Sequence, residues 1–238
     1  MSLYQKYRPK TFHDVVGHEL VTTILKKQVT RGITPHACLF IGPSGVGKTT
    51  IARILAQAVN CDHPRGGEPC YRCQGCQNAS WGILEFNSAS YRGIDAMREM
   101  IIGASYMAIS KYKVYLMDEV HMLTMEAWNA ILKLLEEPPP HLKIILCTTD
   151  AERIPETVQS RCQVFRLPHL SVPAVIRKLE HISKHERMEL PQSSIRFIAE
   201  MALGNLRQAE NMLEQSRMLN HGKPDRRHLR QFFQAKLV

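Results

Sequence analysis

A glycine-rich turn between an apolar run and a helical run constrains this chain more than any other segment. The run before the turn, Leu39-Phe40-Ile41, has the composition of a buried strand, and Thr50-Ile51-Ala52-Arg53 after it begins a helical pattern. The turn matches the pattern G-x-x-x-x-G-K-[ST] and reads Gly42-Pro43-Ser44-Gly45-Val46-Gly47-Lys48-Thr49. A strand, a glycine turn and a helix in this order predict an α/β fold built on a parallel sheet.

The same turn, together with Thr50, predicts a binding site for the phosphates of ATP. Its glycines let backbone N–H groups converge on phosphate oxygens, and the helix N-terminus adds a partial positive charge. We expect Lys48 to reach the terminal phosphates and Thr49 to offer its hydroxyl to Mg²⁺. A turn that merely joins a strand to a helix is the alternative, and the complete pattern in its expected context argues against it.

Five short apolar, β-rich runs recur along the first two thirds of the chain, with helical patterns between them. This alternation predicts a five-stranded parallel sheet covered by helices on both faces. The runs lie at residues 38–42, 83–88, 114–119, 143–149 and 162–167, and the clearest helical patterns lie at 49–60, 94–105 and 126–137. We expect residues 60–80, which are rich in Gly, Pro and Cys, to be irregular.

The character of the sequence changes after Pro168. No strand-like run follows, and amphipathic helical patterns continue from Val172. Gly204-Asn205 and Gly222-Lys223-Pro224 divide this region into about three or four helices. We therefore expect an α/β domain at residues 1–167 and a small all-helical domain at residues 168–238.

An acidic pair stands at the end of the third predicted strand. The apolar run Val114-Tyr115-Leu116-Met117 leads to Asp118 and Glu119, and ligands of open α/β sheets bind at the carboxyl edge. We expect Asp118 to hold Mg²⁺ through its water shell and Glu119 to orient and deprotonate the water that attacks ATP. Alone, such a pair is often a solvated turn; beside the glycine turn it predicts ATP hydrolysis.

The charge balance is basic, with Lys+Arg 31 against Asp+Glu 22 and a net charge of +9. This balance favours a polyanionic partner, either nucleic acid or the phosphates of a nucleotide, and a solvated basic surface is an equal alternative. The sequence shows neither a signal peptide nor an apolar run of membrane-spanning length, so we expect a cytoplasmic protein with no membrane partner.

Four of the seven cysteines follow the spacing C-x8-C-x2-C-x2-C in the segment expected to be irregular. Four thiolates suit tetrahedral Zn²⁺ and leave no position for water, so we expect a structural zinc site. A redox role for the C-x2-C pairs is the alternative, and the fourth cysteine favours zinc. The predicted ligands are Cys61, Cys70, Cys73 and Cys76, whereas Cys38, Cys147 and Cys162 lie on predicted strands as buried thiols.

Further motifs resemble those of the clamp-loader AAA+ ATPases, and within that family the gamma/tau subunits of bacterial DNA polymerase III. The resemblance runs from Tyr7-Arg8-Pro9 and Asp14-Val15-Val16-Gly17 into the helical region and covers nearly the whole chain. It implies an AAA+ P-loop NTPase fold with a helical lid, and it supports the zinc site. The motifs that carry it are Asp118-Glu119-Val120-His121, Leu135-Glu136-Glu137-Pro138-Pro139, Ser160-Arg161-Cys162 and Gly204-Asn205-Leu206-Arg207.

The resemblance also implies roles for single residues. Arg161 would be an arginine finger that acts in the ATP site of a neighbouring subunit, where it would offset charge on the transferred phosphoryl group. Thr149 would be the first sensor of the γ-phosphate, and Arg207 the second sensor, in the lid. The adenine pocket would be lined by Tyr7, Arg8, Pro9 and Val16.

The function implied is that of an ATP-driven motor subunit, which loads a sliding clamp onto primer-template DNA as a component of a DNA-directed DNA polymerase holoenzyme. The partners implied are other clamp-loader subunits, the clamp and the DNA, in a hetero- or homo-oligomer. Ser90 and Arg92 are the candidate DNA phosphate contacts. An N-capping serine beside an exposed arginine is an equal alternative.

Two other functions stay open. The first is a catalytically passive structural subunit of the clamp loader, against which the intact Lys48 and Glu119 argue. The second is another AAA+ DNA-remodelling ATPase, such as a branch-migration motor, against which the cysteine array argues. The family's helical collar has no counterpart before Val238, so we expect either a fragment of motor and lid or a naturally short version.

Overall fold

The computed structural model describes residues 1–90, 93–107, 110–219 and 226–234. The chain divides into two compact units. The larger comprises Lys10–Gly42 and Lys48–Leu167, and the smaller comprises Met1–Pro9, Pro43–Gly47 and Pro168–Val238. The first nine residues thus belong with the helical unit. Among the described residues, no helix has both the length and the apolar character needed to cross a bilayer.

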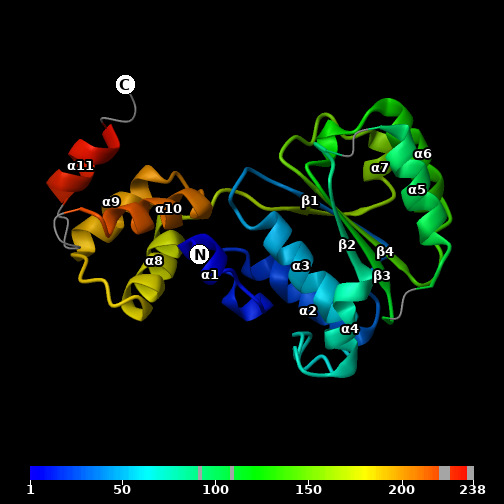
Figure 1. The fold of residues 1–238 in the computed structure, drawn as a ribbon, viewed down its shortest axis with the longest axis horizontal. Coiled ribbons are helices and arrows are strands. Elements are labelled where there is room, and N and C mark those ends of the chain that lie inside the picture. Colours follow the sequence, from blue (N-terminus) through cyan, green and yellow to red (C-terminus); the bar gives the residue numbers. More distant parts are fainter. Residues whose placement is uncertain (91–92, 108–109, 220–225, 235–238) are drawn as a thin grey trace. The chain divides into compact units, whose positions relative to one another are not determined.

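The larger unit is built on a parallel sheet (Figure 1), which confirms the predicted five-stranded α/β architecture. Its central strands are buried along almost their whole length, as expected for a parallel sheet covered on both faces. Ile41 lies opposite Thr148, and Asn87 lies opposite Asp118, so the carboxyl ends of four strands form one edge. The strand order is β2 (Ile83–Asn87), β3 (Lys113–Asp118), β4 (Leu142–Thr148), β1 (Ala37–Ile41) and β5 (Gln163–Arg166).

Helices cover both faces of this sheet (Figure 1). One face carries α2 (Glu19–Arg31), α3 (Lys48–Val59) and α4 (Gln74–Gly82), and the other carries α5 (Ile94–Ala104), α6 (Met125–Glu136) and α7 (Glu156–Gln159). Short 3₁₀ turns lie at Phe12–Asp14 and Val120–Met122.

The helix α6 shows why these residues form this layer. Thr124 caps its N-terminus, because the Thr124 hydroxyl accepts a hydrogen bond from the Ala127 amide at 3.3 Å. Its predicted apolar face is buried in the core, which includes the fully buried Trp128 of the same helix. Pro138 then follows within two residues of the last helical position, where a proline stops further helix.

The prediction of irregular structure over residues 60–80 is wrong in its second half, where α4 begins at Gln74. Cys73 caps this helix, since its Sγ accepts a hydrogen bond from the Cys76 amide at 3.3 Å. The buried face of α4 consists of Cys76, Ala79 and Gly82, which are small. These residues give only a weak apolar period, which explains why sequence pattern did not indicate a helix.

The smaller unit is helical, and the described residues after Pro168 form four helices. They are α8 (Val172–His185), α9 (Gln192–Met201), α10 (Leu206–Ser216) and α11 (Arg226–Gln234). The N-terminal helix α1 (Leu3–Lys6) packs on α10, where the Leu3 amide donates to the Glu214 carboxylate at 3.3 Å. Asn205 caps α10 by accepting a hydrogen bond from the Gln208 amide at 3.0 Å.

Candidate functional site

The glycine turn connects β1 to α3 at the carboxyl edge of the sheet. Gly42 has no room for a side chain, because a Cβ there would lie 2.2 Å from the Leu167 carbonyl oxygen. Gly45 and Gly47 have φ values of 74° and 109°, a region in which residues with a side chain are strained. The buried Lys48 ammonium donates to the Gly42 carbonyl at 2.8 Å, so the loop is closed on itself.

The Gly45 backbone also contacts the start of α10. The Leu206 amide donates to the Gly45 carbonyl at 3.1 Å, and a Cβ on Gly45 would lie 1.9 Å from Oδ1 of Asn205. Asn205 therefore contacts the glycine turn at Gly45, in addition to capping α10. It was not among the residues predicted for the site, although it stands inside the motif that ends at Arg207.

Thr49 and Asp118 meet in the larger unit. The Thr49 hydroxyl donates to Oδ2 of Asp118 at 2.7 Å, and Oδ1 of the same carboxylate accepts from the Glu119 amide at 3.0 Å. A hydroxyl and a carboxylate held side by side at a strand end are oxygen ligands of the kind that Mg²⁺ prefers. The two residues predicted to hold magnesium are thus in direct contact.

Glu119 lies beside this pair in an unusual backbone conformation, with φ at 53°. Non-glycine residues in this region cost energy, and they cluster at active sites. The Glu119 carboxylate accepts a hydrogen bond from the Thr149 hydroxyl at 3.2 Å. The predicted water-activating residue and the predicted first sensor therefore contact each other.

His121 and Thr148 complete this cluster and were not predicted as site residues. The His121 Nδ1 atom lies 3.2 Å from the Thr148 hydroxyl and 3.4 Å from the Glu119 carboxylate. Because the Thr148 hydroxyl gives its own proton to the Asp150 carbonyl at 2.9 Å, Nδ1 must carry the hydrogen. In this tautomer His121 presents an N–H group, not a lone pair, toward the Glu119 carboxylate.

Arg161 is engaged by other partners. Its guanidinium donates to Glu136 at 2.5 Å and to the Thr157 carbonyl at 2.7 Å, and its side chain is 34% exposed. Neither of these partners belongs to the cluster around Asp118. Its role as an arginine finger for a neighbouring subunit stays a prediction.

The residues predicted to recognise adenine and to sense the γ-phosphate belong mainly to the smaller unit. The Tyr7 hydroxyl donates to Glu186 at 2.6 Å, and burial beside this carboxylate raises the pKa of Tyr7 to about 12. The Arg207 guanidinium lies 5.8 Å from the centre of the Tyr4 ring. Arg8 and Pro9 lie in the same unit and Val16 in the larger one, so the adenine pocket stays a prediction.

The candidate DNA contact is described only in part. Ser90 is exposed in the turn after β2, where its amide donates to the Asn87 carbonyl at 2.9 Å. Arg92 lies outside the described residues. The predicted contact between these two residues and DNA phosphates therefore stays a prediction.

The four predicted zinc ligands converge. Their sulfur atoms all lie within 4.8 Å of one another, with the Cys61 and Cys73 sulfurs 3.8 Å apart and the Cys70 and Cys76 sulfurs 3.9 Å apart. A tetrahedron with Zn–S bonds of about 2.3 Å has edges of about 3.8 Å, so the spacing fits this ion. Backbone N–H groups of Arg72 and Cys73 lower the pKa of Cys70 to about 6, which favours a thiolate at this position, whereas burial raises the pKa of Cys61 and of Cys76.

The parallel sheet, the phosphate-binding loop and the adjoining helices define a P-loop protein of the AAA+ class. The fold is shared with the Holliday junction branch migration motor RuvB of Thermotoga maritima, with a TM-score of 0.72 and 17% identity over 96% of this chain and 72% of that one. A point mutant of the same RuvB protein gives a TM-score of 0.73 at 16% identity, over 97% of this chain and 73% of that one.

The chain belongs to the family described as DNA polymerase III, delta subunit, whose model matches residues 17–171. It is 40% identical to DNA polymerase III subunit gamma of Buchnera aphidicola subsp. Acyrthosiphon pisum, over 92% of this chain and 62% of that protein. It is 40% identical to subunit tau of Bacillus subtilis and 41% identical to subunit tau of Escherichia coli, over 90% of this chain in each case. The predicted resemblance to gamma/tau subunits is thus confirmed.

This chain spans only part of these relatives. The matched region is 62% of the Buchnera protein, 39% of the Bacillus protein and 34% of the Escherichia protein.

Proposed function

We propose that this chain is the ATP-driven motor subunit of a clamp loader, which loads a sliding clamp onto primer-template DNA within a DNA polymerase III holoenzyme. The observation that carries the proposal is the contact between Thr49 and Asp118 beside a complete phosphate-binding loop. Identity of about 40% to gamma and tau subunits along most of the chain supports the replication role. Such a protein would work in the cytoplasm.

The nucleotide chemistry follows from the positions of these residues. With ATP bound, the Lys48 ammonium exchanges the Gly42 carbonyl for phosphate oxygens, which are the stronger acceptors because they are charged. Thr49 and Asp118 are the residues that would hold Mg²⁺, which would neutralise charge on the phosphates. Glu119 orients and deprotonates the attacking water, while Thr149 fixes the carboxylate at 3.2 Å.

Hydrolysis in this proposal is shared between subunits. Arg161 would enter the site of a neighbour and Arg207 would report on the γ-phosphate from the lid. Arg161 is engaged by Glu136, at the end of α6. This ion pair holds the guanidinium in the isolated chain, and it must open before Arg161 can meet a phosphate across an interface.

We also propose that Cys61, Cys70, Cys73 and Cys76 bind one structural Zn²⁺. The sulfur spacing supports this proposal. Four thiolates would fill all four positions of a tetrahedral ion and leave none for water, so the ion would be structural. The ion would hold together a segment with few apolar residues before α4. A redox disulfide is the alternative, and it would use only two of the four thiols.

A branch-migration motor is the second candidate, because the solved structures that share the fold include RuvB proteins. That likeness rests on 17% identity and concerns the fold alone. The 36–41% identity to gamma and tau subunits favours clamp loading. A passive structural subunit is the third candidate, and the contact between Glu119 and Thr149 argues against it, because it holds the carboxylate where a water could be activated.

Clamp loading by the complete complex tests the proposal. The full-length protein is assembled with its partner subunits, and transfer of a fluorescent sliding clamp to primer-template DNA is followed with ATP. Loading that requires ATP, and that falls at least about tenfold in Arg161→Ala, supports the motor role. Unchanged loading by a Lys48→Ala protein would contradict it. ATP-dependent movement of a four-way junction without clamp loading would favour the second candidate.

A further inference from the structure

A second basic surface lies outside the nucleotide site, between α2 and the segment that precedes α4. It is a shallow cleft of about 290 Å³. Five of its lining residues come from α2 at spacings of three and four, so they form one stripe along the helix. The opposite side of α2 is buried through Thr22, Leu25 and Val29. The lining residues, which we call the α2 cleft, are Thr23, Lys26, Lys27, Thr30, Arg31 and Gly66.

The wall opposite α2 is a tight turn. Arg65 and Glu68 form an antiparallel bridge, and Gly66 and Gly67 between them have φ values of 60° and 83°. A Cβ on Gly67 would lie 2.4 Å from the Lys26 carbonyl oxygen, so the turn rests directly on the helix. A Cβ on Gly66 would meet nothing within 4 Å, so this residue leaves the cleft open.

The carboxylate of Glu68, which lies beside the cleft, is already neutralised. Glu68 pairs with Lys26 at 3.2 Å, and it also accepts hydrogen bonds from the Phe12 and His13 amides at 2.7 and 3.0 Å. Within the part of the chain that the structure describes, no carboxylate forms an ion pair with Lys27 or Arg31. The α2 cleft therefore carries a net positive charge that these described residues do not offset.

The chemistry of the lining selects a phosphate backbone. The lining offers ammonium, guanidinium and hydroxyl groups and no large apolar side chain, so its polar groups suit an anionic partner better than an apolar peptide side chain. Lys27 and Arg31 are separated by one turn of helix, a rise of about 6 Å, which is of the order of the spacing between neighbouring phosphates in a strand. The net charge of +9 favours the same class of partner.

We infer that the α2 cleft binds the phosphate backbone of a DNA strand, at a place separate from the predicted contact at Ser90. Gln28 of α2 donates to Gln163 of β5 at 2.7 Å, whereas Ser90 follows β2. Because β5 and β2 are the two edges of the sheet, the two surfaces lie at opposite edges. The cleft holds DNA through backbone contacts, and it is therefore sensitive to salt and indifferent to base sequence.

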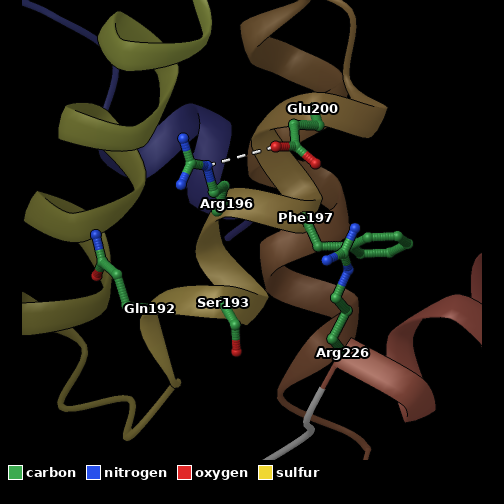
Figure 2. Close-up of a pocket in the computed structure, with 6 residues that line it drawn as sticks. All are labelled: Gln192, Ser193, Arg196, Phe197, Glu200 and Arg226. Atoms are coloured by element: carbon green, nitrogen blue, oxygen red, sulfur yellow. Dashed lines mark ion pairs between the residues drawn. The ribbon is translucent and has the colours of Figure 1, made fainter.

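A second hollow provides a matched control. This hollow lies in the smaller unit and has a volume of about 360 Å³. In Figure 2, Arg196 points to Glu200, and the two side chains form an ion pair at 3.5 Å. The Arg226 guanidinium lies 5.7 Å from the centre of the Phe197 ring. Neutralising these two arginines removes the same charge as neutralising Lys27 and Arg31, from a hollow whose cations already have partners.

The test is fluorescence anisotropy with the purified chain, without nucleotide, and a fluorescein-labelled oligothymidylate strand in roughly 50–200 mM salt. The double variant Lys27→Gln/Arg31→Gln should bind roughly tenfold more weakly. Its plot of log affinity against log salt should be shallower by about 1.4, because two single-strand phosphate contacts are lost. Arg196→Gln/Arg226→Gln should bind within about twofold of the unchanged chain, and thermal unfolding of both variants should match it.

Three results would overturn the inference. One is equal affinity and equal salt dependence in the α2 cleft variant. Another is an equal loss in the control variant, which would show that only total charge matters. The third is a labelled polyglutamate peptide that binds more tightly than DNA and loses its binding in Lys27→Gln/Arg31→Gln, since this would identify an acidic protein as the partner.

Discussion

The Thr49 hydroxyl donates a hydrogen bond of 2.7 Å to the carboxylate of Asp118. These residues are separated by 69 positions in the sequence, and the sheet and α3 bring them together at one edge. A nearby backbone amide, that of Glu119, already fixes the second oxygen of Asp118. The pair is thus held in place by hydrogen bonds within the chain. In the proposed mechanism a divalent cation would take the place of the Thr49 hydroxyl proton between these two residues.

Removal of the Thr49 hydroxyl tests this pair. Thr49→Ala should weaken binding of Mg²⁺-ATP by roughly tenfold or more, while binding of ATP in EDTA should change little, because the lost group serves the ion. Isothermal titration calorimetry with and without Mg²⁺ measures both. Thr23→Ala, at an exposed threonine of α2, is the control. Equal losses with and without Mg²⁺ would show that Thr49 serves the phosphates or the fold instead.

The tight turn at Gly66 and Gly67, which packs against α2, predicts unequal effects of substitutions at its two glycines. Gly66→Ala should cost about 1 kcal/mol of folding free energy, because only its positive φ is strained. Gly67→Ala should cost clearly more, since its Cβ would also lie 2.4 Å from the Lys26 carbonyl oxygen. Urea denaturation of both variants measures the difference. Equal costs would mean that the turn does not rest on the helix.

Glu210 predicts a pH-dependent stability. Its burial raises the pKa of this carboxyl from 4.5 to about 7, and Lys178 and Arg207 offset only part of the shift. Because the folded pKa is raised, the stabilisation is complete below about pH 4.5 and is lost as the pH rises through 7. As the pH rises from about 4.5 to 8, the free energy of unfolding of Glu210→Gln should increase relative to that of the unchanged chain, by at most roughly 3 kcal/mol. Urea denaturation at several pH values measures this difference in unfolding free energy between the two proteins. A difference that stays constant with pH would contradict the raised pKa of Glu210.

The cysteine cluster predicts one bound zinc per chain. Elemental analysis of protein purified without chelator should find one equivalent, and Cys73→Ser should lose it and unfold at lower temperature. Cys147→Ser, at a buried cysteine of β4, is the control, because it should keep the metal even if it lowers the unfolding temperature. A full complement of zinc in Cys73→Ser would rule out the four-thiolate site.

Local spacing was enough to predict a large part of this protein. The loop from Gly42 to Thr49 and the pair at Asp118 follow fixed patterns, and alternating strands and helices determine that both reach the same edge. Cysteine spacing likewise predicted a cluster whose sulfurs the structure brings within 4.8 Å. These sites could be predicted because their residues are close in sequence or because the regular alternation of strands and helices brings them to the same edge of the sheet.

Other features depend on contacts that no pattern encodes. His121 reaches Thr148 across 27 positions, and Asn205 reaches Gly45 from another part of the chain. The helix α4 was not predicted, because its buried residues are small and give only a weak apolar period. Arg161 differs again, since its predicted role needs a second subunit and its contacts within one chain do not indicate it.

The most direct test of the account is ATP turnover by the assembled complex with clamp and primer-template DNA present. Glu119→Gln should bind ATP as tightly as the unchanged protein and hydrolyse it at least ~100-fold more slowly, because the side chain keeps its shape and loses its capacity to accept a proton. Equal turnover in both proteins would contradict the assignment of Glu119. Absence of turnover in both would contradict the motor function itself.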